Sequence, residues 1–131
     1  MVFIIYTVHY IYYKLYIPYT LYSIAGYVLG EFGVNICEQP DAGGYEQFIA
    51  LQQHFVRVGP KTKSLLLTAY VKILNLYPTL KDIITDVFTK YSTSQHLELQ
   101  QRSCEYRLMP NIDATIMESV LDSMPVFNEK V

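Results

Sequence analysis

Two carboxylates four residues apart are the first feature of this chain that could do chemistry. Asp82 and Asp86 fall on one face of a helix at that spacing, as a paired-carboxylate site for acid–base catalysis would need. Such a pair catalyses only where an apolar pocket raises one of the two pKa values, and the sequence shows no such pocket beside it. We therefore predict that both side chains are solvated surface, and we predict the same for Glu98 and Glu105.

The other reactive residue types are scattered. The three histidines (His9, His54 and His96) have no metal-ligand spacing to one another or to a cysteine, and His54 is expected to pack or hydrogen-bond at a helix edge. Cys37 and Cys104 lie far apart, and we interpret both as reduced thiols of a cytosolic protein. No serine sits in a nucleophile elbow either. The sequence therefore predicts neither an enzyme nor a cofactor or metal site.

Three glycines, Gly26, Gly30 and Gly33, recur at a spacing that invites comparison with a phosphate-binding loop. The lysine of a P-loop and the preceding strand of a dinucleotide-binding fingerprint are both missing. Glycines at helical spacing instead allow two helices to approach closely, and we prefer that interpretation.

One charged cluster could bind a partner. Arg57, Lys61 and Lys63 lie across a predicted helix–helix turn, where they could contact an anionic lipid headgroup or the acidic surface of another protein. The alternative is that they form a solvated loop end. No nucleic-acid partner is expected, because that class needs a strong basic excess and this chain has a net charge of −2.

The first part of the chain differs in composition from the rest. Residues 1–22 hold seven of the 13 tyrosines, and Lys14 is their one charged side chain, although charged residues make up 17% of the whole chain. The length suits a membrane span. However, Lys14 and Pro18 interrupt the segment, and tyrosine prefers the membrane interface. Two interpretations stay open, a membrane anchor and an extension that is not native to the fold.

Residues 23–125 show helical periodicity, most clearly after Pro60, which is placed like a first-turn proline. Six apolar residues then recur at the offsets of one helical face: Leu66, Ala69, Tyr70, Ile73, Leu74 and Tyr77. Pro78 ends this helix, and Thr79 is placed to cap the next one, which runs to Tyr91. Two long amphipathic helices so closely joined must fold into an antiparallel hairpin.

The first of these helices is apolar around most of its circumference. Only four of its residues are expected to face solvent, namely Lys61, Lys63, Lys72 and Asn75. Such a helix should be covered on more than one side. Further helices are predicted at 26–37, 45–58 and 94–108 and after Asp113, with Ser94 and Asp113 as caps and a loop at 39–44. This succession predicts an all-α fold of stacked α-solenoid type, with a plain helical bundle as the alternative.

Several segments, in this order, resemble the trunk of the alpha-adaptins, the large alpha subunits of the endocytic clathrin adaptor complex. They are GYVLGEFG (26–33), the QF-x-x-L-x-x-x-F run (47–55), TKSLLLTAYVKILNLYP (62–78), ELQQRSCEY (98–106) and MPVF (124–127). The ELQQR-x-x-EY element is shared with the gamma subunit of the related Golgi adaptor, whereas LGEFG points to alpha. The resemblance covers about residues 24–127, and residues 126–131 fit the start of the linker that follows the trunk.

This resemblance implies a HEAT/armadillo-like solenoid fragment, from the C-terminal part of the trunk, that acts as a non-enzymatic scaffold in clathrin-mediated endocytosis and vesicle protein transport. Its partners would be the other adaptor-complex subunits, with clathrin reached indirectly and peripheral membrane association through the full complex. The location implied is the coated pit, on the cytoplasmic face of the plasma membrane. No cofactor and no ligand-binding residue carries over. The alternative function is a small membrane-anchored helical protein that uses residues 1–22 as its anchor.

Overall fold

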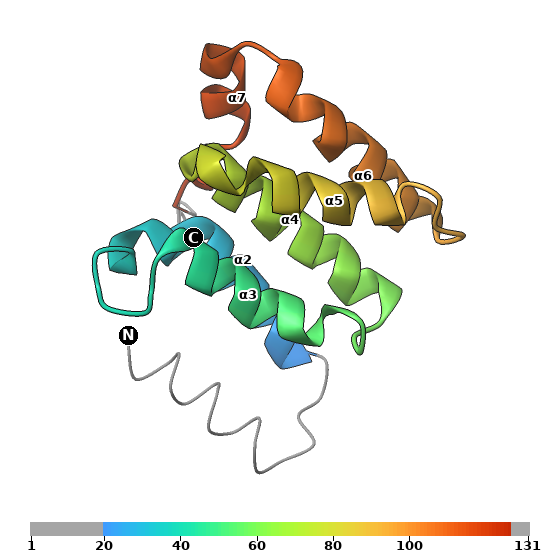
Figure 1. The fold of residues 1–131 in the computed structure, drawn as a ribbon, viewed down its shortest axis with the longest axis horizontal. Helices are drawn as coiled ribbons and strands as arrows, with labels where there is room; N and C mark the ends of the chain where they lie inside the picture. Colours follow the sequence, from blue (N-terminus) through green and yellow to red (C-terminus); the bar gives the residue numbers. More distant parts are fainter. Residues whose placement is uncertain (1–19, 127–131) are drawn as a thin grey trace, which may run out of the picture.

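The computed structural model describes residues 20–126, which form six α-helices and no strand (Figure 1). The helices are α2 (Thr20–Phe32), α3 (Gly44–Phe55), α4 (Pro60–Leu76), α5 (Lys81–Tyr91), α6 (Leu97–Leu108) and α7 (Ala114–Val120). Short 3₁₀ turns lie at Gly33–Ile36, Pro78–Leu80 and Met109–Asn111. The predicted all-α class is confirmed. Residues 1–19 and 127–131 lie outside the described part, so the interpretations of segments 1–22 and 126–131 stay predictions.

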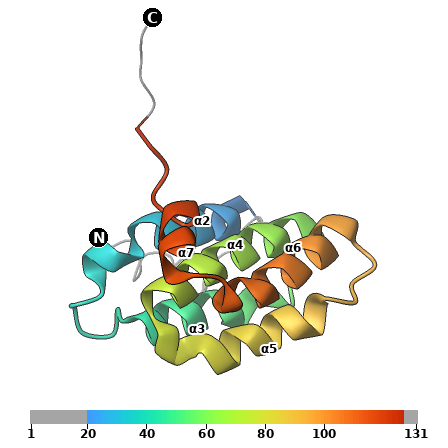
Figure 2. The same cartoon turned by 90° about the horizontal axis from the view of Figure 1, so that it is seen from above.

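The helices alternate between two layers. Figure 2 shows α2, α4 and α6 side by side in one layer, with α3 and α5 in the other. Helices of one layer run in the same direction. Ser23 and Glu31 of α2 pair with Thr62 and Lys72 of α4 in the same order along the chain. Arg102 and Tyr106 of α6 likewise pair with Ser64 and Thr68 of α4. This alternation is the arrangement of an α-solenoid and not of a plain bundle.

Helix α4 lies at the centre of the described residues. It packs against α2, α3, α5 and α6, and Leu66, Leu67 and Tyr70 have no exposed surface. The prediction that α4 is covered on more than one side is therefore confirmed. The prediction of its solvent-facing residues holds only in part. Lys61 is exposed and Lys63 and Asn75 are half-buried, but the Lys72 side chain is only 13% exposed because it pairs with Glu31 of α2. Leu65 and Leu76, predicted to lie on the apolar face, are exposed.

The predicted hairpin of α4 and α5 is confirmed, with Pro60 as the first residue of α4. The predicted cap at Thr79 is wrong. The residue that precedes α5 is Leu80, whose φ of −88° and ψ of 6° are not those of an extended residue. A capping side chain normally reaches forward from an extended residue to the first N–H groups of the helix, and the 3₁₀ turn at Pro78–Leu80 puts an apolar residue at that position.

Two other helix starts also differ from prediction. Helix α6 begins at Leu97, and Ser94 accepts a hydrogen bond from the N–H of His96 instead of capping the helix. Helix α2 begins at Thr20, inside the segment 1–22, and the Tyr22 ring lies 4.8 Å from that of His54. The packing role predicted for His54 is thus confirmed. The cap predicted at Asp113 is confirmed by its 2.8 Å hydrogen bond from Thr115 N.

The close approach of α2 and α4 depends on two glycines. A Cβ atom on Gly30 would lie 3.2 Å from the Cα of Ala69, and one on Gly26 would lie 2.5 Å from a methyl carbon of Leu66. A side chain at Gly30 would press on the backbone of α4, and one at Gly26 would force the Leu66 side chain to shift. The helix-packing interpretation of these glycines is therefore confirmed.

Gly30→Val is expected to lower the free energy of unfolding by about 1–3 kcal/mol, because overpacking pushes α2 away from Ala69. The helix propensity gained by removing a glycine, less than about 1 kcal/mol, offsets only part of this loss. Urea denaturation followed by circular dichroism measures the difference. Gly59→Ser is the control, since no atom lies within 4 Å of a Cβ there and serine suits the position before α4. Equal stability of the two variants would contradict the packing described.

No helix among residues 20–126 combines the length and the apolar character needed to cross a membrane.

Candidate interaction surfaces

The turns between helices gather at two edges of the molecule, and the charges differ between them. The α3–α4 and α5–α6 turns lie on the right in Figure 1, whereas the α4–α5 turn and α7 lie on the left. We define the basic edge, on the right, by Arg57, Lys61, Lys63 and Lys90. We define the acidic edge, on the left, by Glu38, Asp41, Glu46, Asp82 and Asp113, among which Lys81 is an exposed basic residue. A charge separation of this kind orients a partner of complementary charge as it approaches.

The basic edge contains the three residues predicted from the sequence. Arg57 and Lys61 are exposed, and Lys63 is half-buried because its Nζ lies 5.5 Å from the centroid of the Tyr91 ring. Lys90 Nζ lies 5.7 Å from the same centroid. Tyr91 therefore makes cation–π contacts with two ammonium groups, one from α4 and one from α5. Sequence reasoning missed Lys90, although the antiparallel hairpin that it predicted places the end of α5 beside the start of α4.

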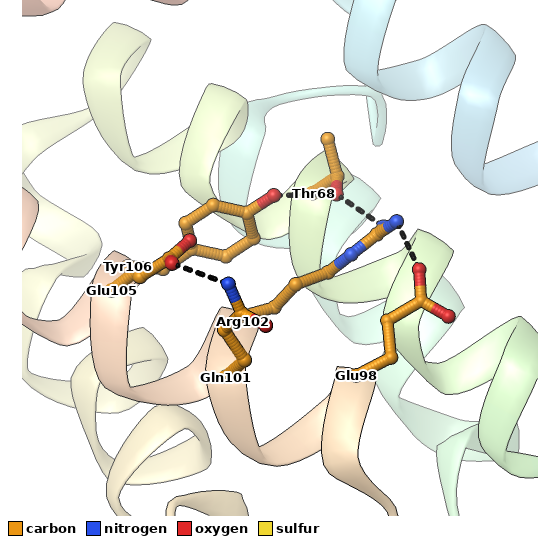
Figure 3. A pocket seen from close by; sticks show the side chains of 6 residues that line it. All are labelled: Thr68, Glu98, Gln101, Arg102, Glu105 and Tyr106. Carbon is orange, nitrogen blue, oxygen red and sulfur yellow. Dashed lines mark hydrogen bonds and ion pairs between the residues drawn. The ribbon is translucent and has the colours of Figure 1, made fainter.

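A polar pocket of about 430 Å³ lies between α4 and α6 (Figure 3). Its six lining residues are Thr68 of α4 and Glu98, Gln101, Arg102, Glu105 and Tyr106 of α6. The five residues from α6 all belong to the ELQQRSCEY segment that carries much of the family resemblance. At this pocket, the ELQQRSCEY segment of α6 thus packs against α4.

Arg102 is the central residue of this pocket. Its Nη1 donates to Ser64 O and to Thr68 Oγ1, each at 3.0 Å, and its Nη2 pairs with Glu98 Oε1 at 2.5 Å. The Tyr106 hydroxyl lies 2.9 Å from Thr68 Oγ1 (Figure 3). These hydrogen bonds join α6 to α4 across the pocket. The polar residues of the segment therefore hold two solenoid helices together.

The candidate acid–base residues are on the surface. Asp82 and Asp86 are both exposed, as predicted. Glu98 and Glu105 are exposed too, although Arg102 pairs with the first and Gln101 donates to the second at 2.9 Å. General acid–base catalysis requires a carboxyl group whose pKa is tuned by burial, so this geometry favours a surface role.

The described cysteines and histidines are dispersed. Cys37 and Cys104 are half-buried free thiols whose Sγ atoms donate to Val34 O and Ser92 O, respectively. Among residues 20–126 there is no group of three or more potential ligands that could hold a metal ion. His9 lies outside that range.

A charged pair that sequence reasoning missed links α2 to α4. The ammonium of Lys72 pairs with Glu31, and the two side chains are only 13% and 6% exposed. Burial lowers the pKa of Lys72, and the nearby charge of Asp122 partly opposes that effect. The sequence contains a weak signal of this pair. Glu31 is the first acid of the chain, and it directly follows Gly30, which brings α2 against α4.

No protein-family model matches the chain. Among curated proteins, it is 39% identical over 108 residues to AP-2 complex subunit alpha-2 of Dictyostelium discoideum, which is 82% of this chain and 11% of that protein. It is 40% identical over 107 residues to AP-2 complex subunit alpha of Schizosaccharomyces pombe, covering 82% of this chain and 12% of that protein. AP-1 complex subunit gamma-1 of Arabidopsis thaliana matches at 29% identity over 123 residues, 84% of this chain and 14% of that protein. The chain spans only 11 to 14% of the length of these relatives.

Proposed function

This chain belongs to the adaptins, as a homologue of one segment of the AP-2 complex alpha subunits, and we propose that it is a scaffold segment of an adaptor complex. One observation carries the proposal. The two segments that most resemble the family, 62–78 and 98–106, contact each other as α4 and α6 through Arg102 and Tyr106. The resemblance therefore lies in the residues that build the solenoid layer.

The mechanism that we propose is geometric and involves no catalytic step. Stacked helix pairs form a rigid surface, because α4 is covered by four other helices and Leu66, Tyr70 and Ile73 on its apolar face are buried. Such a surface holds partner subunits at fixed positions. The wider role we infer is in clathrin-mediated endocytosis and vesicle protein transport, with peripheral membrane association and clathrin contact through the full complex. The place would be the coated pit on the cytoplasmic face of the plasma membrane.

We further propose that the basic edge contacts an acidic surface of a partner subunit. Arg57 and Lys61 are exposed there, and Lys63 and Lys90 both contact the Tyr91 ring. The half-buried state of Lys63 favours a protein partner over a lipid headgroup, since a membrane surface is best contacted by extended lysines. Complementary charge of this kind mainly speeds association and fixes orientation.

Arg57→Glu/Lys61→Glu is expected to weaken binding to the other adaptor subunits by at least about tenfold, and the loss should shrink as salt rises. Co-purification and surface-based kinetics of the whole chain with those subunits measure the effect. Lys81→Glu is the matched control, because Lys81 is an equally exposed lysine at the start of α5, on the other side of the molecule.

The possible outcomes distinguish the scaffold proposal from the proposal for the basic edge. If the unaltered chain binds none of the other subunits, the scaffold proposal is wrong. If it binds them and the double variant binds equally well, the proposal for the basic edge is wrong and the scaffold proposal stands. A loss of binding to phosphatidylserine vesicles, without loss of subunit binding, would assign the edge to a membrane instead.

The alternative function, a membrane-anchored protein, rests on the composition of residues 1–22. Carbonate extraction of membranes from expressing cells distinguishes the two functions. Retention of the chain in the membrane pellet supports the anchor, and release into the supernatant supports the scaffold.

A further inference from the structure

The carboxylate of Glu31, near the end of α2, is shared by two distant parts of the chain. Its Oε1 pairs with Lys72 of α4, and its Oε2 accepts the main-chain N–H of Met124 at 3.0 Å. The Glu31 side chain is only 6% exposed. A charged pair so far from water is tolerated when its remaining hydrogen-bonding capacity is filled. The Met124 N–H supplies one of those hydrogen bonds.

The segment after α7 turns back across the solenoid to reach this carboxylate. Leu121 packs against the core, and the charge of Asp122 acts on Lys72. Met124 contributes a second contact, because its Sδ accepts a hydrogen bond from the Tyr27 hydroxyl at 3.9 Å. Figure 2 shows this segment leaving α7 beside α2.

We propose that residues 121–126 form a strap, docked on the α2–α4 pair through Glu31, that fixes the direction in which the chain leaves the helical layers. The strap is held at few points, since Met124 is 58% exposed and Val126 is 91% exposed. Helix α7 before it buries only Met117. The strap can therefore undock without disturbing the core around α4.

Lys72 prepares the docking site. Because it pairs with Oε1 of Glu31, the carboxylate keeps its orientation whether or not the strap is docked. Undocking exposes Oε2 and the Tyr27 hydroxyl to water, which can replace both hydrogen bonds, and it releases Leu121 from its contact at the edge of the core. The inference does not depend on the proposed function, because all of its contacts lie within this chain.

Hydrogen exchange of main-chain amides in the whole chain tests the strap. After correction for intrinsic rates, the Met124 amide should exchange about tenfold more slowly than that of Val126, as one hydrogen bond to a charged group implies. Glu31→Ala should remove that difference, and Glu31→Gln should keep part of it, because the amide oxygen still accepts. Glu118→Ala is the matched control, an exposed carboxylate on α7 whose loss should leave Met124 unchanged.

A second variant keeps the test valid if Glu31→Ala does not fold, since that change leaves Lys72 buried without its partner. Met124→Pro removes both strap contacts, the N–H that bonds to Glu31 and the Sδ that accepts from Tyr27, and the Lys72–Glu31 pair stays intact. Cleavage by endoproteinase Asp-N before Asp122 should then be about tenfold faster, with unchanged helical circular dichroism. Cleavage at the original rate, or equal exchange of Met124 and Val126 in the unaltered chain, would overturn the proposal.

Discussion

Replacing Ile84 with alanine is expected to lower the free energy of unfolding by about 2–5 kcal/mol, whereas the same change at Ile83 should cost less than about 1 kcal/mol. Ile84 has no exposed surface, and Ile83 is 37% exposed. Both residues lie in α5, so the change in helix propensity is the same. The difference between the two variants therefore measures burial against the neighbouring helices.

The loss at Ile84 has two physical parts. The alanine variant removes less apolar surface from water when it folds. It also contains a cavity, because the close-packed side chains around the shortened residue relax only partly. Urea denaturation followed by circular dichroism gives both values on one scale. Similar small losses at the two positions would mean that α5 does not close on its neighbours, and the solenoid architecture would then be wrong.

Gln47→Met should lower the free energy of unfolding by about 2–4 kcal/mol, because methionine fills a similar volume but donates no hydrogen bond. Gln47 is 3% exposed. Its Nε2 donates to Gly33 O and to Ala42 O, each at 2.8 Å. The substitution leaves both buried carbonyl groups without this donor, and each such loss costs about 1–3 kcal/mol.

Gln53→Met is the matched control for Gln47, because Gln53 is an exposed glutamine on the same helix. Its stability should change by less than about 0.5 kcal/mol. The same denaturation experiment compares the two variants. A Gln47 variant as stable as this control would show that the two carbonyl groups find other donors.

Gln47 connects two of the segments that resemble the adaptins. Gly33 ends the GYVLGEFG segment, and a Cβ atom there would collide with Gln47 Oε1. Gln47 opens the QF-x-x-L-x-x-x-F segment, in which Phe48 and Phe55 pack their rings against Tyr70. The residues that carry the resemblance thus contact one another across the fold, although they were recognised one segment at a time.

The helix ends show where sequence reasoning fails. Asp113 caps α7 as predicted, because its extended backbone lets the carboxylate reach Thr115 N. Thr79 and Ser94 are the same class of residue but do not cap α5 or α6. Before α5 the chain passes through a 3₁₀ turn that ends at Leu80, and before α6 the N-cap position is occupied by His96, two residues after Ser94. A capping residue type therefore predicts a cap only when the fold places it at the N-cap position itself.

The sequence alone determined the helices, their apolar faces, the α4–α5 hairpin and the resemblance to the adaptins. All of these follow from residues three or four positions apart, or from short segments, so they are encoded locally. Tertiary structure decided which polar residues meet. Lys72 and Glu31 are 41 positions apart, and Glu31 and Met124 are 93 positions apart. Such pairs depend on how closely the helices stack. The glycines of α2 permit this close stacking, but no pattern of neighbouring residues predicts which side chains it brings together.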